Sequence, residues 1–258
     1  MKIIVLSENT ARDGVLECEH GLSLYIEALG HRILFDMGGS DLFYKNAKKL
    51  GVNLSLVDFA VISHGHSDHG GGLESFLRIN SHAPVYISPF AFEPHYNGQN
   101  KYIGLDADLA KESRLVFVEK EEIIDTGLRI FNTNGRKSNS PINAFGQMTI
   151  VNGELKKEDY RHEQYLEICE GERKILISGC SHRGILNIME WEKPDVIIGG
   201  FHLSKITDNC ILKDYAEKLS AYNTQYYTCH CTGTEQFKFM KQHINSLNYI
   251  ACGDKIEF

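Results

Sequence analysis

The chain has 258 residues, enough for one large α/β domain with a substantial core. Hydrophobic residues make up 42% and charged residues 24%, ordinary values for a globular protein in water, and the formal net charge is -7. Proteins that bind nucleic acid usually carry a basic stripe, and none is visible here, so no nucleic-acid partner is expected.

Apolar runs are short throughout the chain. The first, at residues 3–6, is too short for a signal peptide, and no run approaches the length that spans a bilayer. The seven cysteines lack the spacing of a disulfide framework, and we interpret them as free thiols in a reducing compartment. The sequence therefore predicts a cytoplasmic protein that has no membrane partner.

Strand and helix patterns alternate along most of the chain. Strands are predicted where short apolar runs end at turn-forming residues, at 2–6, 22–26, 33–35, 56–62, 85–88, 165–169, 174–178, 195–198 and 225–228. Helices are predicted where apolar residues recur at helical spacing, at 41–50, 72–80, 185–191, 211–219 and 233–244. This alternation predicts a single α/β domain over residues 1–258.

The patterns are weaker between about residues 89 and 146. This stretch holds a loop at 132–141 that is rich in Asn, Ser and Gly, together with strand candidates at 115–118 and 128–131. We expect an insertion or loop region that lies over one end of the fold, where such segments often shape a substrate pocket.

The most informative motif is the run SHGHSDHGGG at residues 63–72, which follows the predicted strand at 56–62. Alternate residues of an extended segment point the same way, so His64, His66 and Asp68 can converge. His69 is then turned toward a second position. The three glycines that follow let the chain bend sharply beside these side chains.

Three imidazoles and a carboxylate within six residues predict a metal site. Two metal ions about 3.5–4 Å apart would use this set, with His64 and His66 on one ion and Asp68 and His69 on the other. Imidazole and carboxylate ligands suit zinc, iron or manganese. The alternative, a solvated loop with chance histidines, accounts poorly for four ligand-capable residues in six positions.

The motif H-x-H-x-D-H at 64–69 resembles the signature of the metallo-β-lactamase superfamily, and the resemblance covers nearly the whole chain. Three later segments, GCSH at 179–182, GGFHL at 199–203 and CHCTG at 229–233, look most like one branch. Its members resemble dihydropterin-ribofuranosyl-aminobenzene phosphate synthase. The resemblance implies a four-layer αβ/βα sandwich with the metals at one edge of two packed sheets.

The resemblance also implies two further ligands, His182 for the first ion and His230 for the second. His162 competes with His182, but a surface histidine is the favoured interpretation because His162 lies in the charged stretch 158–163. Many superfamily members carry an aspartate that bridges both metals where this chain has Cys180. A thiolate ligand and a buried thiol that only packs are both open interpretations.

Three other residues lie near these motifs. His202 follows a predicted strand and is a candidate to protonate a leaving group or bind an anionic substrate, with a structural role as an equal alternative. Arg183 is a candidate to bind a phosphate or carboxylate, and an exposed salt bridge is its favoured alternative. We expect Asp36 either to orient a ligand histidine or to form a turn before Gly38.

The leading hypothesis is a metal-dependent hydrolase in which metal-activated hydroxide, held and oriented by Asp68, attacks a small anionic phosphoester, acyl or lactone substrate. The expected cofactors are two divalent metal ions, zinc first, with iron or manganese as alternatives. The resemblance implies a second hypothesis, a transferase that condenses a pterin diphosphate with an arylamine ribofuranosyl phosphate. A non-hydrolytic diiron redox or sensing protein is the third.

Overall fold

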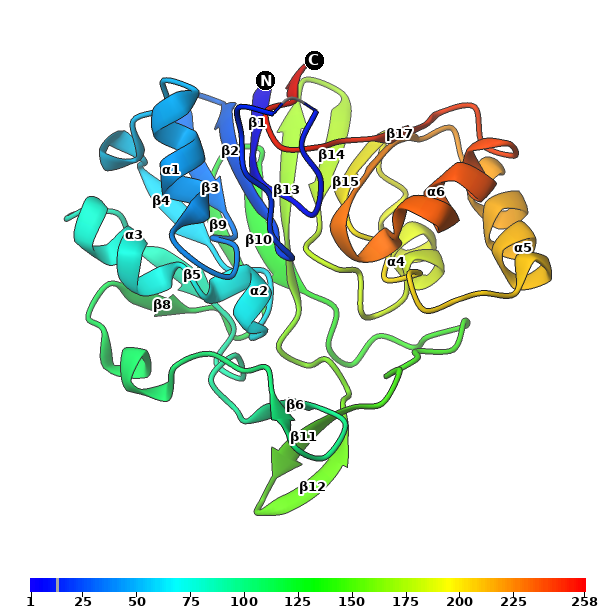
Figure 1. Ribbon diagram of the computed structural model, residues 1–258, viewed down its shortest axis with the longest axis horizontal. Coiled ribbons are helices and arrows are strands. Elements are labelled where there is room, and N and C mark those ends of the chain that lie inside the picture. The colour runs from blue at the N-terminus through cyan, green and yellow to red at the C-terminus, as the bar shows by residue number, and fades with distance from the viewer. Residues whose placement is uncertain (13) are drawn as a thin grey trace.

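Two large sheets face each other and carry helices on their outer sides, as Figure 1 shows. The computed structural model describes residues 1–12 and 14–258. Each large sheet has seven strands. This arrangement is the αβ/βα sandwich that the sequence predicts.

The first sheet combines an antiparallel half with a parallel half. Its strands are, across the sheet, β18 (Lys255–Glu257), β1 (Lys2–Ser7), β2 (Ser23–Ala28), β3 (His31–Phe35), β4 (Phe59–Val61), β5 (Val85–Ile87) and β8 (Leu115–Phe117). Pairing is antiparallel from β18 to β3 and parallel from β3 to β8. The α-helices of this half are α1 (Leu42–Lys49), α2 (Ser67–Gly70) and α3 (Leu73–Ile79).

The second sheet repeats this plan. Its strands are, across the sheet, β17 (Leu247–Tyr249), β16 (Gln225–Thr228), β15 (Val196–Gly199), β14 (Arg173–Ile177), β13 (Gln164–Glu170), β10 (Leu128–Asn132) and β9 (Glu121–Asp125). Strands β14 to β17 are parallel, and β9, β10, β13 and β14 are antiparallel. The helices of this half are α4 (Ile185–Glu192), α5 (Asn209–Ser220) and α6 (Thr234–Lys241).

A third, four-stranded sheet lies beyond the ends of the two large ones (Figure 1). Its strands are β12 (Glu154–Lys157), β11 (Gln147–Val151), β6 (His95–Asn97) and β7 (Lys101–Tyr102). Three 3-10 turns complete the elements, η1 (Leu54–Leu56), η2 (Ala107–Lys111) and η3 (His230–Thr232).

The stretch at 89–146 is only in part an insertion. Strands β8, β9 and β10 belong to the large sheets, whereas β6 and β7 pair with β11 to build the small one. The sequence missed this small sheet because its strands are short, two of them, β7 and β12, are exposed, and none carries a clear apolar alternation. The strand predicted at 56–62 is also shorter, since η1 occupies its start.

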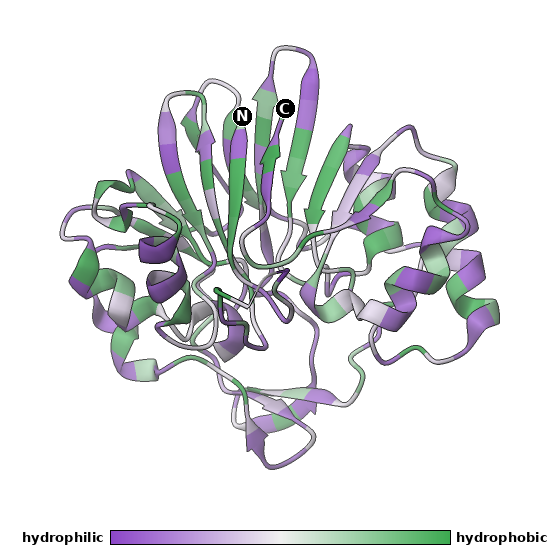
Figure 2. Ribbon diagram, turned by 45° about the horizontal axis from the view of Figure 1, so that its top comes forward, coloured by the Kyte–Doolittle hydropathy of each residue, from purple (hydrophilic) through white to green (hydrophobic). Residues whose placement is uncertain are grey.

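The core is layered because alternate residues of a strand point to opposite faces. In β1, Ile3 and Val5 lie in the core between the two sheets, whereas Ile4 and Leu6 lie in the core that contains Phe43 of α1. Strands buried on both faces must be apolar almost throughout. Figure 2 shows this, with the strands of the large sheets mostly hydrophobic and the helices mixed.

The parallel halves of the two sheets position the functional side chains. Strand β4 leads into the motif at 63–72, and β14, β15 and β16 lead into the three later histidine-bearing segments. The carboxyl ends of parallel strands lie at one edge of a sheet, so all four segments gather at one end of the sandwich. Within the described residues, no helix is long and apolar enough to cross a membrane.

Replacing Ile168 of β13 with alanine tests the core between the sheets. Ile168 is fully buried there, so Ile168→Ala is expected to lower the free energy of unfolding by about 2–4 kcal/mol through lost contacts and a cavity. Ile123→Ala on β9, where the side chain is 62% exposed, is the control and should change it by less than about 0.5 kcal/mol. Urea denaturation followed by circular dichroism measures both, and equal losses would contradict this core.

Candidate metal centre

Segments from both sheets and from the small sheet enclose a cavity of about 240 Å³ at the strand ends. Its walls include the ligand candidates His66, Asp68, His182 and His230. Residues of β6, β7 and β11 cover it from the side of the small sheet. The cavity therefore opens where the predicted metal ligands meet.

The first predicted ligand set comes together. His64, His66 and His182 are buried, and one ring nitrogen of each lies within 4.8 Å of the others. The two Nε2 atoms of His64 and His182 are 3.2 Å apart. Residues more than a hundred positions apart in the chain thus face a common point.

The second predicted set also converges. The Nε2 atoms of His69 and His230 are 3.1 Å apart. The carboxylate oxygen Oδ2 of Asp68 lies 3.4 Å from Nε2 of His230 and 3.9 Å from Nε2 of His69. All six residues predicted to bind metal therefore belong to one of two compact sets.

Hydrogen bonds to Asp36 fix the tautomers of two ligands. The buried Asp36 carboxylate accepts from the backbone N–H of Ser63, the Ser63 hydroxyl and Nδ1 of His69, each at 2.7 Å. Because the Ser63 proton goes to Asp36, Ser63 Oγ accepts from Nδ1 of His64 at 2.8 Å. In their neutral forms His64 and His69 thus carry their protons on Nδ1 and leave Nε2 bare, which is the arrangement that the orienting role expected of Asp36 requires.

Asn9 fixes the tautomers of two more histidines. Its Oδ1 accepts from Nδ1 of His230 at 2.7 Å and from the backbone N–H of Gly21 at 3.3 Å, which leaves His230 Nε2 bare. Its Nδ2 donates to Nδ1 of His20, so His20 carries its proton on Nε2, 3.2 Å from Asp68. His20 therefore holds Asp68 in place through a hydrogen bond and does not itself offer a lone pair.

This donor set fits a divalent cation. In their neutral forms, His69 and His230 both present a bare Nε2, and these two atoms face each other at 3.1 Å with no proton to share. Their lone pairs repel unless positive charge lies between them. Neighbouring ligand atoms of a tetrahedral zinc ion with bonds of 2.0–2.1 Å lie about 3.3 Å apart, close to the separation found here.

The electrostatics of the first set favour metal binding. Burial, together with the neighbouring imidazoles, lowers the pKa of His64, His66 and His182 well below the ordinary value for histidine. These rings are therefore neutral near pH 7, the state in which imidazole binds metal.

In the second set the carboxylates decide the charge. Burial alone would lower the pKa of His69, but Asp36 and Asp68 outweigh it and the pKa is raised. Burial alone would raise the pKa of Asp68, but His69, His20 and His230 outweigh it and the pKa lies well below its ordinary value. The second set therefore contains an ionised carboxylate and attracts positive charge.

Cys180 lies between the two sets. Its sulfur is 3.2 Å from Nε2 of His69, and it groups with His64 on one side and with His230 and Cys231 on the other. Burial, followed by the neighbouring Cys231, raises the pKa of the Cys180 thiol well above its ordinary value. The thiol therefore lies between the two predicted ligand sets and contacts His69, as the bridging position implied by the resemblance requires.

The structure brings His202 to the site but not Arg183. His202 lines the cavity, its ring centroid is 4.2 Å from that of His182, and burial lowers its pKa to about 3, so it is neutral near pH 7. Arg183 does not line this cavity; its Nη1 donates to the carbonyl of Asp159 at 2.9 Å. The guanidinium of Arg183 thus hydrogen-bonds to a backbone carbonyl and not to a carboxylate, which differs from both expected roles.

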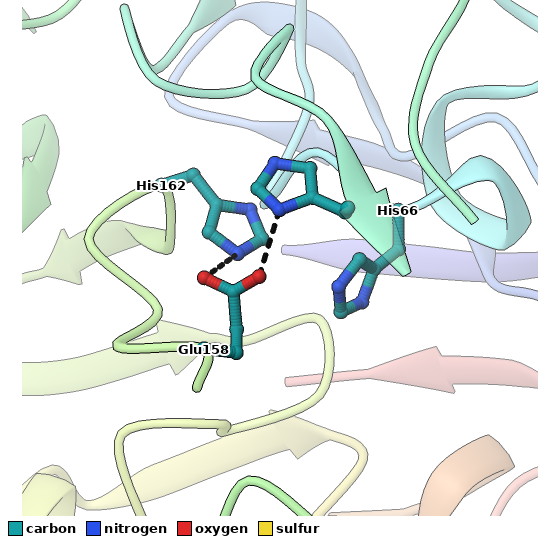
Figure 3. A group of neighbouring side chains, drawn as sticks. His66, Glu158 and His162 are labelled. Atoms are coloured by element: carbon teal, nitrogen blue, oxygen red, sulfur yellow. Dashed lines mark hydrogen bonds and ion pairs between the residues drawn. The ribbon is translucent and has the colours of Figure 1, made fainter. Parts of the chain in front are cut away.

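The interpretation of His162 as a surface residue is wrong. His162 is fully buried and groups with His66, His95 and Glu158. Figure 3 shows His162 beside Glu158, with His66 nearby. Sequence patterns did not single out His20, Asn9 and His95, which lie outside the motifs, or Glu158, which lies in the charged stretch 158–163. Only the chain's return through the small sheet brings His95 and Glu158 to the motif.

A second cavity of about 340 Å³ adjoins the first and shares His182, His202 and Lys205 with it. Most of its other walls are apolar or aromatic, including Phe145, Ile185, Phe201, Leu203, Ile206, Ile211 and Tyr215. The metal centre thus has an apolar chamber beside it.

The protein combines a sandwich of two sheets with histidine-rich candidate ligand sets at the strand ends. These features place it in a class of metal-binding proteins that have a metallohydrolase fold. The family model of the metallo-beta-lactamase superfamily matches residues 16–192. The chain belongs to this superfamily, whose fold implies divalent metal binding.

Relatives along the whole chain agree with this assignment. An uncharacterised protein of Methanocaldococcus jannaschii is 30% identical over 256 residues, 96% of each chain. Another protein of that organism, named 7,8-dihydropterin-6-methyl-4-(beta-D-ribofuranosyl)-aminobenzene-5'-phosphate synthase, is 28% identical and covers 100% of this chain and 97% of its own. The predicted branch of the superfamily is thereby confirmed.

Solved structures agree as well. The crystal structure of a metal-dependent hydrolase of the beta-lactamase superfamily matches with a TM-score of 0.82 and 31% identity, covering 100% of this chain and 99% of that one. A metallo-beta-lactamase fold protein of Bacillus subtilis matches with a TM-score of 0.62 and 13% identity, covering 100% and 99%, and shares the fold.

Replacing Asp36 with asparagine tests the orientation of the ligands. An amide cannot accept all three hydrogen bonds, so Asp36→Asn is expected to weaken zinc binding about 10–100-fold. Competition with a chromogenic chelator measures the affinity. The control is Asp58→Asn, at a surface carboxylate that accepts from the backbone N–H of Arg32 at 2.7 Å and should leave affinity unchanged. Equal affinities in both variants would contradict the role of Asp36.

Proposed function

We propose that the protein is a dinuclear metal-dependent hydrolase of small anionic substrates, with zinc as the first candidate metal. The observation that carries the proposal is the pair of ligand sets, in which imidazole nitrogens from distant parts of the chain face each other at 3.1 and 3.2 Å. His64, His66 and His182 would hold one ion. Asp68, His69 and His230 would hold the other, with Cys180 between them.

When bound, two such ions activate water as a nucleophile and stabilise the negative charge that develops during its attack. The chain's own residues orient the reaction. The Nε2–H of His20 holds the Asp68 carboxylate at 3.2 Å. This carboxylate would accept a hydrogen bond from the attacking water and so orient it. His202 lies at the cavity wall and is neutral. It would therefore bind the substrate through a hydrogen bond and not through a charge–charge interaction.

The charge of the cavity walls supports an anionic substrate. Lys101 and Lys205 line the metal-site cavity, and Lys205 also borders the apolar chamber. A substrate with an anionic group at the metal ligands and an apolar body beside it would use both cavities. This arrangement favours phosphoester, lactone or acyl compounds that carry an apolar or aromatic part.

A transferase remains the second candidate. The relative named as a dihydropterin aminobenzene phosphate synthase covers the full chain, although at 28% identity. A condensation needs room for two reactants, and the two adjoining cavities, of about 240 and 340 Å³, would provide it. The metal ions held by the same residues would then bind the diphosphate leaving group of the pterin substrate.

The number of ions is tested by metal analysis after reconstitution. The zinc-loaded protein is expected to hold two ions per chain, and His182→Ala and His230→Ala should each lose one. His31→Ala is the control, because His31 pairs with Asp125 near the surface, away from the site. A wild-type protein that holds a single ion would contradict the dinuclear proposal.

Hydrolysis is tested with a panel of phosphoesters, lactones and a pterin diphosphate offered with an arylamine ribofuranosyl phosphate. Asp68→Ala and His66→Ala are expected to lower turnover at least ~100-fold without unfolding the chain, because both remove groups at the reacting centre. Full activity in both variants would rule out the proposed site. A condensation product with no hydrolysis would favour the transferase.

A further inference from the structure

A second group of buried polar residues packs against the ring of His66, one of the candidate metal ligands. It consists of His95 of β6, Glu158 after β12, and His162 before β13, which we call the inner cluster. Their exposures are 0%, 5% and 0%. Figure 3 shows the carboxylate of Glu158 facing the imidazole of His162, with His66 beside them. The metal centre described above does not use these three residues.

The hydrogen bonds of the inner cluster assign its protons. The backbone N–H of Gly65 donates to Nδ1 of His162 at 2.8 Å, so His162 carries its proton on Nε2, which faces Glu158 Oε1 at 3.5 Å. Nδ1 of His95 donates to Glu158 Oε2 at 2.8 Å. His95 therefore presents a bare Nε2.

These assignments argue against a metal ion inside the cluster, although its four potential ligand atoms, including one from His66, lie within 4.8 Å of one another. His162 has no free lone pair, because one nitrogen accepts a backbone N–H and the other carries a proton. Glu158 already accepts from His95 and from the backbone N–H of Tyr160. Two nitrogens are left, whereas a structural zinc site needs four ligands.

The two remaining nitrogens are Nε2 of His95 and Nε2 of His66. Both are buried and have no hydrogen-bond partner in the described part of the chain. The two ring centroids are 5.5 Å apart. A histidine that binds a metal through one nitrogen keeps a proton on the other and needs an acceptor for it. His95 offers such an acceptor, since Glu158 holds the His95 proton on the opposite nitrogen.

We propose that the inner cluster is a positioning device for the first metal site: His95, held by Glu158, accepts the Nε2 proton of His66 and so directs Nδ1 of His66 to the metal. The proposal rests on the metal-dependent function proposed above. His162 of the same cluster accepts from the backbone N–H of Gly65, where a Cβ would lie 2.1 Å from the carbonyl oxygen of Ala91, and its Nε2 lies 3.5 Å from Glu158 Oε1. The inner cluster thus lies against both the side chain of His66 and the backbone before it.

The first test removes the charge of Glu158. Glu158→Gln is expected to weaken the first zinc site about 10–100-fold and to leave the second site unchanged. Chelator competition and the absorption spectrum of the cobalt-substituted protein report this without any substrate. The matched control is Glu192→Gln, since Glu192 is also buried, at 7% exposure, but pairs with Lys174 and Arg136 away from the metal centre.

The second test replaces the acceptor. His95→Phe keeps a ring but accepts nothing and should weaken the first site as Glu158→Gln does, whereas His95→Gln keeps an acceptor and should restore most of the affinity. In the wild-type zinc protein, long-range ¹H–¹⁵N spectra should place the proton of His66 and that of His162 on Nε2. This last measurement needs no variant, so a variant that fails to fold leaves the proposal testable.

Three results would overturn the proposal. They are an unchanged first site in Glu158→Gln, a proton on Nδ1 of His66 in the zinc protein, and a third metal equivalent that Glu158→Gln removes. The last would make the cluster a metal site in its own right. Failure of the hydrolase proposal would give a different result. The zinc affinities of the variants and the proton positions of His66 and His162 would be as expected, but no substrate would be turned over.

Discussion

The metal centre depends on one buried carboxylate, that of Asp36 at the end of β3. It accepts three hydrogen bonds, from the backbone and hydroxyl of Ser63 and from His69. A carboxylate can only accept, so each donor is committed and the protons of two ligand histidines are placed on the nitrogens that face away from the metal position. Asp36 itself adopts a left-handed φ of 58°, a conformation that is strained outside glycine and that its surroundings must hold.

The two-sheet architecture supplies the rest of the geometry. Parallel strands β4, β14, β15 and β16 end at one edge, and the segments that follow bring ligands from both halves of the chain to within hydrogen-bond distance. Polar networks of this density are stable in a core only when their members are satisfied. Here Asn9, Ser63 and Asp36 accept from the Nδ1 atoms of His230, His64 and His69, and His20 donates to Asp68. The Nε2 atoms of these three ligand candidates are left for metal.

Much of the fold and of the ligand set followed from the sequence, because both depend on local patterns. Strands buried on two faces read as apolar runs, and the ligands of the motif lie within six consecutive residues. His182 and His230 were found by resemblance, since no local rule links them to His64. The inner cluster escaped prediction, and His162 was misassigned, because a histidine in a charged stretch looks exposed until the small sheet covers it. Arg183 was misplaced for a related reason: adjacency to His182 in sequence did not carry its guanidinium into the cavity.

The sequence by itself thus determined the class of fold and the superfamily, and it singled out the six candidate ligands that the structure brings together in two sets. Only the tertiary structure decided which nitrogen of His64, His69 and His230 is bare, that Cys180 lies between the two sets, and that His95, Glu158 and His162 lie next to His66. The physical reason is that residue types and spacing specify which groups can bind a metal, whereas the direction of each lone pair is set by hydrogen bonds to partners far away in the chain.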